Sequence, residues 1–140
     1  MRIALIGLTL VFTSAALAQD AASDIKKMAG TWKIVVHEAS GKATPKDNLE
    51  KMEGKLVVEG DKYKVYFGKD FVDKGTMKLD ASKSPRQIDA KTQNDEVMLG
   101  IYKFEGDEMT VCFGQPGVER PKEFKTKEGQ VLVGYKRVKE

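Results

Sequence analysis

Two ten-residue segments, residues 59–68 and 105–114, repeat one pattern in which a Gly-Asp pair separates two short runs of alternating apolar and polar residues. A Gly-Asp pair between such runs indicates a two-residue hairpin turn, because glycine adopts a positive φ without steric cost. A turn of this length sets the register, so we expect Val58 opposite Tyr63 in the first hairpin and Tyr102 opposite Val111 in the second. The repeat therefore predicts antiparallel β structure.

The same alternation continues between turn residues along the rest of the chain, and about eight strands of this kind can close a small up-and-down antiparallel barrel. We predict an all-β fold with strands at residues 30–38, 55–59, 62–67, 71–79, 86–91, 98–105, 108–113 and 131–138. One short helix is expected in the first inter-strand loop, with Thr44 as its N-cap, Pro45 at its first position and Gly54 after its last turn.

Side chains two residues apart on a strand share one face, so the alternation also predicts which residues point inward. We take the apolar face of the two hairpins as the barrel interior. Continuing the alternation adds these interior residues: Trp32, Ile34, Val36, Phe71, Met77, Leu79, Ile88, Val133 and Tyr135. His37 and Cys112 fall on the outward face, on strands too far apart for a nucleophile–base pair.

Residues 1–18 have the features of a cleavable secretory signal, with Arg2, an apolar run over residues 3–12 and small residues ending at Ala18. The run is shorter than the roughly 20 residues that cross a bilayer. Removing these 18 residues from the 140 leaves 122, which we divide into a short segment at 19–27 and one barrel domain at 28–140. We expect export to the periplasm or the medium, and no membrane span in the mature chain.

Charge and cysteine content exclude several classes of function. The 24 basic and 21 acidic residues give a net charge of +3, whereas nucleic-acid binding needs a concentrated basic face. Cys112 is the only cysteine, so no intramolecular disulfide can form. One histidine and one cysteine cannot supply a zinc site, and the acidic residues lack the spacing of a calcium loop. We therefore predict a monomer with no metal, no cofactor and no catalytic residues, and not an enzyme.

Gly30-Thr31-Trp32 resembles the G-x-W signature of lipocalins. Further stretches resemble an uncharacterised lipocalin-like family abundant in planctomycete bacteria, namely Gly60-Asp61-Lys62-Tyr63, Leu99-Gly100-Ile101-Tyr102, Gly106-Asp107, Cys112-Phe113, Pro116-Gly117, Arg120-Pro121 and Phe124. The resemblance covers residues 28–136 and implies a lipocalin-like barrel, with no activity to transfer. It also implies that Gly30 opens the first strand and that Trp32 closes one barrel end, with Arg137 packed across it. Typical lipocalins are longer and often carry disulfides.

An up-and-down path gathers the longer loops, residues 39–53, 68–70, 92–97 and 114–129, at one end of the barrel, where ligands commonly enter. Candidate ligand-binding residues inside the barrel are Tyr63, Phe67, Met77, Tyr102, Phe113 and Tyr135. Leu49 and Met52 lie three residues apart on the expected helix and are candidates for a partial lid. The charges of the four loops nearly cancel, which favours a small ligand that is largely apolar or amphipathic.

Other interpretations compete with this one. The inward aromatic residues either line a cavity or fill the barrel as a packed core. Trp32 and Arg137 either contact a ligand or form a structural plug, and we favour the plug. The leading hypothesis is non-catalytic binding of a small ligand. The alternatives are a protein-binding barrel of the protease-inhibitor kind, acting through residues 19–27 and 114–129, and a filled structural domain of the cell envelope.

Overall fold

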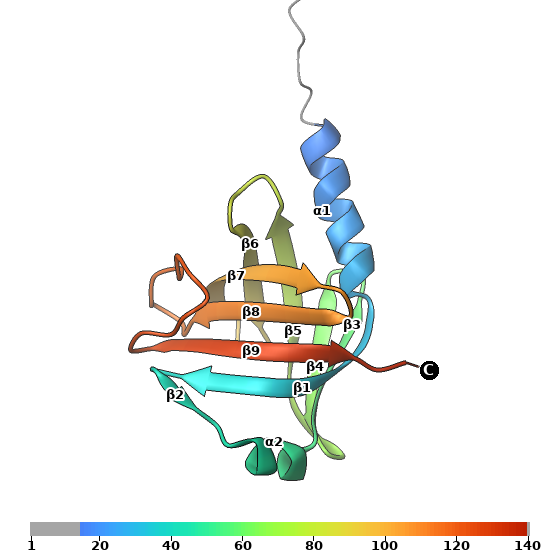
Figure 1. Cartoon of the computed structure of the whole chain (residues 1–140). Helices are drawn as coiled ribbons and strands as arrows, with labels where there is room; N and C mark the ends of the chain where they lie inside the picture. Colours follow the sequence, from blue (N-terminus) through green and yellow to red (C-terminus); the bar gives the residue numbers. More distant parts are fainter. Residues whose placement is uncertain (1–14, 140) are drawn as a thin grey trace, which may run out of the picture.

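The computed structural model describes residues 15–139, and its main feature is a closed antiparallel barrel of eight strands (Figure 1). The elements in chain order are α1 (Ala15–Met28), β1 (Gly30–Ala39), β2 (Lys42–Ala43), α2 (Lys46–Met52), β3 (Gly54–Glu59), β4 (Lys62–Phe67), β5 (Asp70–Asp80), β6 (Arg86–Thr92), β7 (Val97–Glu105), β8 (Glu108–Gly114) and β9 (Gln130–Arg137). Strands β3 to β8 each pair with the next strand in the chain, and β1 pairs with both β3 and β9. The predicted all-β up-and-down barrel is confirmed, and β2 only extends β1 as a short hairpin.

Both predicted hairpins are confirmed in their turns and in their register. Val58 pairs with Tyr63 across the first turn, and Tyr102 pairs with Val111 beside the second. The turn glycine of the second hairpin, Gly106, has a φ of 61°. Because cross-strand partners share a face, the apolar partners of each hairpin point together into the barrel.

A β-bulge in β1 makes part of the predicted inward face wrong. The register between β1 and β9 shifts between Ile34 and Val36, and an extra residue on one strand inverts the alternation beyond it. Val36, predicted to be interior, is 45% exposed. His37, predicted to point outward, pairs with Val133, whose side chain belongs to the core.

A second bulge shifts the register between β4 and β5 at Val65 and Tyr66. Phe71 pairs with Tyr66 and is 47% exposed, so its predicted interior position is also wrong. The two rings pack edge to face outside the barrel, with centroids 5.9 Å apart. On the other side of the bulge, Asp73 pairs with Val65 and lies on the inward face.

Helix α2 differs from its prediction at the N-terminal end, whereas Gly54 follows its last turn as predicted. Pro45 is the N-cap, and Thr44 places its hydroxyl 3.0 Å from the Nδ1 atom of His37 instead of capping the helix. Glu53, with a φ of 49°, ends the helix in the left-handed conformation. Gly54 begins β3. A Cβ atom there would lie 2.8 Å from the Ile34 side chain, so glycine fits this close approach.

The predicted signal sequence lies mainly in residues 1–14, outside the described residues. Its expected cleavage point, after Ala18, falls within α1. Within residues 15–139, neither helix has both the length and the apolar character that a membrane crossing requires.

Candidate functional site

The barrel encloses a cavity of about 120 Å³. Its apolar wall consists of Met28, Leu56, Val58, Val65, Met77, Ile88, Ala90, Met98, Met109, Val111 and Phe113. Its polar groups come from Tyr63, Asp73 and Tyr135. An engineered apolar cavity of about 150 Å³ takes up benzene, whereas drug-sized ligands occupy roughly 300–1,000 Å³. The cavity therefore suits a molecule of about six non-hydrogen atoms.

The cavity is sealed toward α1 and opens toward the loops. Met28, Val58 and Met109, near the α1 end, are each no more than 2% exposed. The lining residues that are only half-buried lie in the strand halves nearest α2 and the 115–129 loop: Val65, Asp73, Ala90, Met98 and Phe113. A ligand would therefore enter at the loop end.

Three polar side chains interrupt the apolar wall. The Tyr63 hydroxyl donates to Oδ2 of Asp73 across 3.4 Å. Burial raises the pKa of Tyr63, and the nearby negative charge of Asp73 raises it further. Burial likewise raises the pKa of Tyr135, with a smaller contribution from Tyr63. Both phenols therefore stay neutral at ordinary pH, and each offers one hydroxyl to the cavity.

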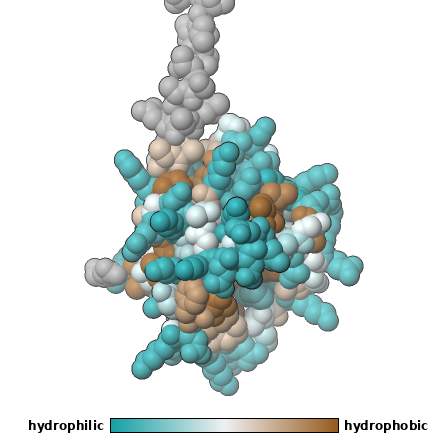
Figure 2. All heavy atoms as spheres, turned by 180° about the vertical axis from the view of Figure 1, so that it is seen from behind, coloured by the Kyte–Doolittle hydropathy of each residue, from teal (hydrophilic) through white to brown (hydrophobic). Residues whose placement is uncertain are grey.

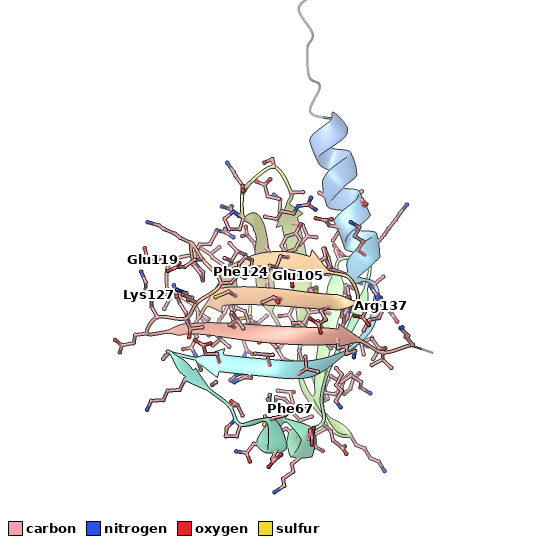
Figure 3. The ribbon with its side chains drawn as sticks, viewed as in Figure 1. Phe67, Glu105, Glu119, Phe124, Lys127 and Arg137 are labelled. Carbon is pink, nitrogen blue, oxygen red and sulfur yellow. The ribbon has the colours of Figure 1, made fainter. Side chains whose placement is uncertain are left out.

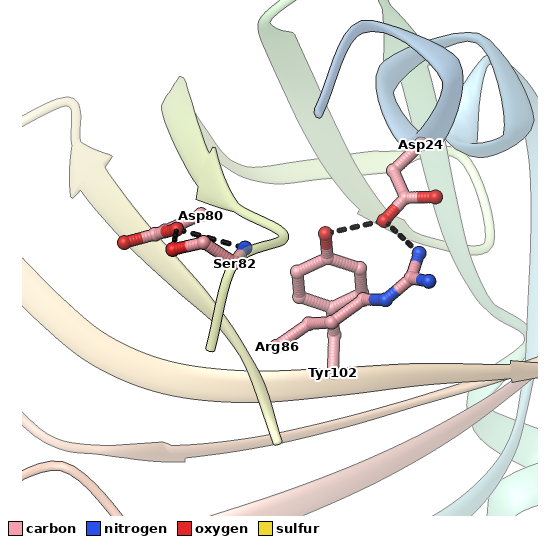
Figure 4. A network of polar contacts seen from close by, with 5 residues as sticks. All are labelled: Asp24, Asp80, Ser82, Arg86 and Tyr102. Atoms are coloured by element: carbon pink, nitrogen blue, oxygen red, sulfur yellow. Dashed lines mark hydrogen bonds and ion pairs between the residues drawn. The ribbon is translucent and has the colours of Figure 1, made fainter. Parts of the chain in front are cut away.

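Helix α1 closes the opposite end through a buried carboxylate (Figure 4). Asp24 is 1% exposed, and its Oδ2 atom accepts hydrogen bonds from Arg86 and from the Tyr102 hydroxyl, each across 2.6 Å. Burial and the contact with Asp24 raise the pKa of Tyr102. The Asp24 contacts fasten α1 to β6 and β7.

In the nearby β5–β6 turn, two hydrogen bonds from Ser82 lower the pKa of Asp80.

Trp32 and Arg137 meet at the same closed end. The guanidinium carbon of Arg137 lies 4.2 Å from the centroid of the Trp32 ring, and the indole Nε1 donates to the Met28 carbonyl across 2.8 Å. Arg137 also donates to the Ala29 carbonyl across 2.7 Å. A Cβ atom on Gly30 would lie 3.0 Å from the Arg137 guanidinium, so glycine fits this position. Figure 3 places Arg137 beside the end of α1, away from the long loop.

The structure brings some of the predicted ligand-binding residues together and separates others from them. The residues that line the cavity are Tyr63, Met77, Phe113 and Tyr135. Tyr102 belongs to the Asp24 cluster, and Phe67 lies beside α2 (Figure 3). Among the lid candidates, Leu49 is buried and Met52 is 43% exposed, and neither lines the cavity.

The long β8–β9 loop is anchored to the outer wall of the barrel. One Nη atom of Arg120 donates to the carbonyls of Ile88 and Gly100 at 3.1 and 2.8 Å, and the other contacts Asp89 at 2.6 Å. Phe124 covers an outer apolar cluster that contains Cys112, which is 0% exposed. Burial raises the pKa of Cys112 to about 11, with a smaller contribution from the charge of Glu38. The single thiol is thus a packed, protonated group.

The described outer surface is far more polar than the cavity wall. Figure 2 shows a largely hydrophilic face broken by separate apolar areas. A wider groove of about 840 Å³ crosses the outside of β3 to β6, and many of its lining side chains are charged: Glu59, Lys62, Lys64, Lys74, Lys91 and Asp95. Within residues 15–139, no three His, Cys, Asp or Glu side chains gather closely enough to hold a metal ion. The mainly apolar cavity inside the barrel is the candidate site.

Comparison with protein-family models and with curated proteins finds no match to this chain. The resemblance to the lipocalin-like family therefore stays a prediction, beside a barrel fold that is established.

Sequence reasoning missed several cavity residues, and Asp73 is the most informative of them. Asp73, Gly75 and Met77 stand two residues apart on β5, so the alternation already placed the carboxylate on the face of Met77. An acidic residue among inward apolar residues was the available signal. Asp24 was missed because only the docking of α1 reveals its burial.

Proposed function

We propose that this chain is an exported, non-catalytic binding protein that holds one small, largely apolar molecule inside the barrel. The observation that supports the proposal is the apolar cavity of about 120 Å³. Most of the cavity wall is apolar, so transferring an apolar molecule or chain from water into it is favourable. The size of the cavity suits a ligand on the order of 100 Da, with about six non-hydrogen atoms.

The first test is native mass spectrometry of the protein purified gently from its own host. We expect a discrete excess mass on the order of 100 Da that is lost on denaturation. The same spectrum tests export, because cleavage after Ala18 would leave Gln19 as the first residue. An intact N-terminus on protein recovered from outside the cytoplasm would contradict the signal-sequence part of the proposal.

A second test uses benzene as a probe and methionine methyl groups as reporters in NMR spectra of the full chain. Met28, Met77, Met98 and Met109 line the cavity, whereas Met52 is exposed outside it. Benzene should shift the signals of the four lining methionines and leave that of Met52 in place. The absence of any shift at saturating benzene would refute binding in the cavity.

A cavity-filling variant provides the control. Ala90 lines the cavity, so Ala90→Leu adds volume inside it and should abolish the benzene shifts. Ala43→Leu adds the same volume on the exposed strand β2 and should leave them unchanged. Equal benzene affinity in both variants would place the ligand elsewhere.

A further inference from the structure

Asp73 places a carboxylate on the inner face of a mainly apolar cavity. Among the described residues that line the cavity, it is the only ionisable acid or base apart from the two tyrosines. Within residues 15–139, no Lys, Arg or His side chain forms an ion pair with it. Its hydrogen bond from Tyr63 is 3.4 Å long, beyond the usual 2.5–3.0 Å for such bonds. Partly burying an unpaired charge is unfavourable, so a bound cation would relieve it.

Tyr135 is a second polar residue at the cavity, and its hydroxyl is available for a hydrogen bond. Tyr135 is only 9% exposed and lines the cavity. Among the described residues, its hydroxyl has no hydrogen-bond partner. No fully buried side-chain N or O atom among the described residues lacks a partner, so this hydroxyl is one that solvent or a ligand can reach. Its neutral hydroxyl can accept a hydrogen bond from a ligand.

These groups together favour one kind of polar head on the ligand. A primary ammonium group carries three N–H donors, which match the acceptors on Asp73, Tyr63 and Tyr135. Hydrogen bonds between charged partners are stronger than neutral ones. A ligand carboxylate would instead bring a second negative charge next to Asp73 and be disfavoured. The apolar wall accommodates a short alkyl chain.

We propose that the cavity selects a small primary alkylammonium ion, with the ammonium group at Asp73 and the alkyl chain against the methionine and valine side chains of the wall. The inference rests on the proposed function and narrows it to a ligand class. It excludes short fatty acids, which the apolar wall alone would admit.

The experiment compares butylammonium, 1-butanol and butanoate, which share an alkyl chain and differ in the head group. Each is titrated at neutral pH into the full chain, and the methyl signals of the lining methionines report binding. We expect butylammonium to bind at least about tenfold more tightly than 1-butanol, and butanoate to bind most weakly.

Two matched variants test the role of the carboxylate. Asp73→Asn should bring the affinities for butylammonium and 1-butanol to within about threefold of each other. Asp70→Asn makes the same charge change at an exposed position on the same strand and should preserve the tenfold preference. A third variant, Tyr135→Phe, should weaken binding of both butylammonium and 1-butanol severalfold.

The outcomes separate this inference from the proposed function. If 1-butanol binds as tightly as butylammonium to the unaltered protein, the ammonium preference is refuted while the binding function stands. If none of the three probes moves the lining methionine signals, both are refuted. Should Asp73→Asn fail to fold, the ranking of the three probes on the unaltered protein still decides the question.

Discussion

Replacing Trp32 with alanine should remove the structural plug at the closed end of the barrel. The indole is 1% exposed, it donates a hydrogen bond to the Met28 carbonyl, and the Arg137 guanidinium lies over its ring. Truncation would leave a void beneath Arg137 and a carbonyl without its donor. Both changes act on the junction where α1 meets β1.

The magnitude follows from the burial of the ring. Removing a buried tryptophan side chain costs about 3–5 kcal/mol, and domains of this size unfold with about 5–15 kcal/mol. At about 4 °C per kcal/mol, the melting temperature should fall by about 12–20 °C. Trp32→Phe keeps most of the ring but loses the N–H donor, so it should cost about 1–3 kcal/mol.

The assay is urea and thermal unfolding followed by far-UV circular dichroism, since Trp32 is the only tryptophan and its fluorescence is lost in both variants. Phe71→Ala is the matched control, because that ring is 47% exposed and its edge-to-face contact with Tyr66 is worth only about 0.5–1.5 kcal/mol. A loss below about 1 kcal/mol for Trp32→Ala, with an unchanged denaturant slope, would show that the plug contributes little.

Three further predictions concern other parts of the barrel. Asp24→Ala removes the acceptor of the buried Tyr102 hydroxyl and should cost about 1–3 kcal/mol, with faster hydrogen exchange in α1; unchanged exchange would contradict the anchoring role. Gly75→Ala should destabilise by about 1–3 kcal/mol, because the new Cβ would lie 1.9 Å from the Lys91 carbonyl oxygen and 2.7 Å from the Tyr63 hydroxyl; an unaltered melting curve would argue against this packing. Burial raises the pKa of Cys112 from 9.0 to about 11. The unfolded chain therefore loses the thiol proton at a lower pH than the folded chain does, and the free energy of unfolding should fall as the pH rises from about 9 to about 11. Cys112→Ala should reduce that alkaline loss, and the folded thiol should react slowly with iodoacetamide at pH 8; rapid labelling would contradict its burial.

The sequence predicts the barrel well because local signals specify it. Gly-Asp turns set the registers of two hairpins, and alternation places the remaining strands to within one residue at most of their ends. The errors begin where a bulge adds one residue to a strand, since a strict period of two cannot anticipate it. Val36, His37 and Phe71 were assigned to the wrong faces for this reason.

The candidate site was less predictable than the fold. Tyr63 and Tyr135 follow from alternation alone, and they do line the cavity. Whether inward aromatic residues fill a barrel or leave a space depends on how their side chains pack, and sequence patterns carry no such information. Asp24 illustrates the remaining gap, because its burial arises from contacts with residues 62 and 78 positions later in the chain.

The pairing of β1 with β9 also determines how the protein can be handled. The start of β1 and the end of β9 lie together at the end that α1 seals, whereas the partly exposed cavity residues face the opposite end. An affinity tag or a surface linkage placed after Arg137 would thus point away from the entrance. A biosensor immobilised through its C-terminus would keep the cavity accessible to small molecules in the surrounding solution.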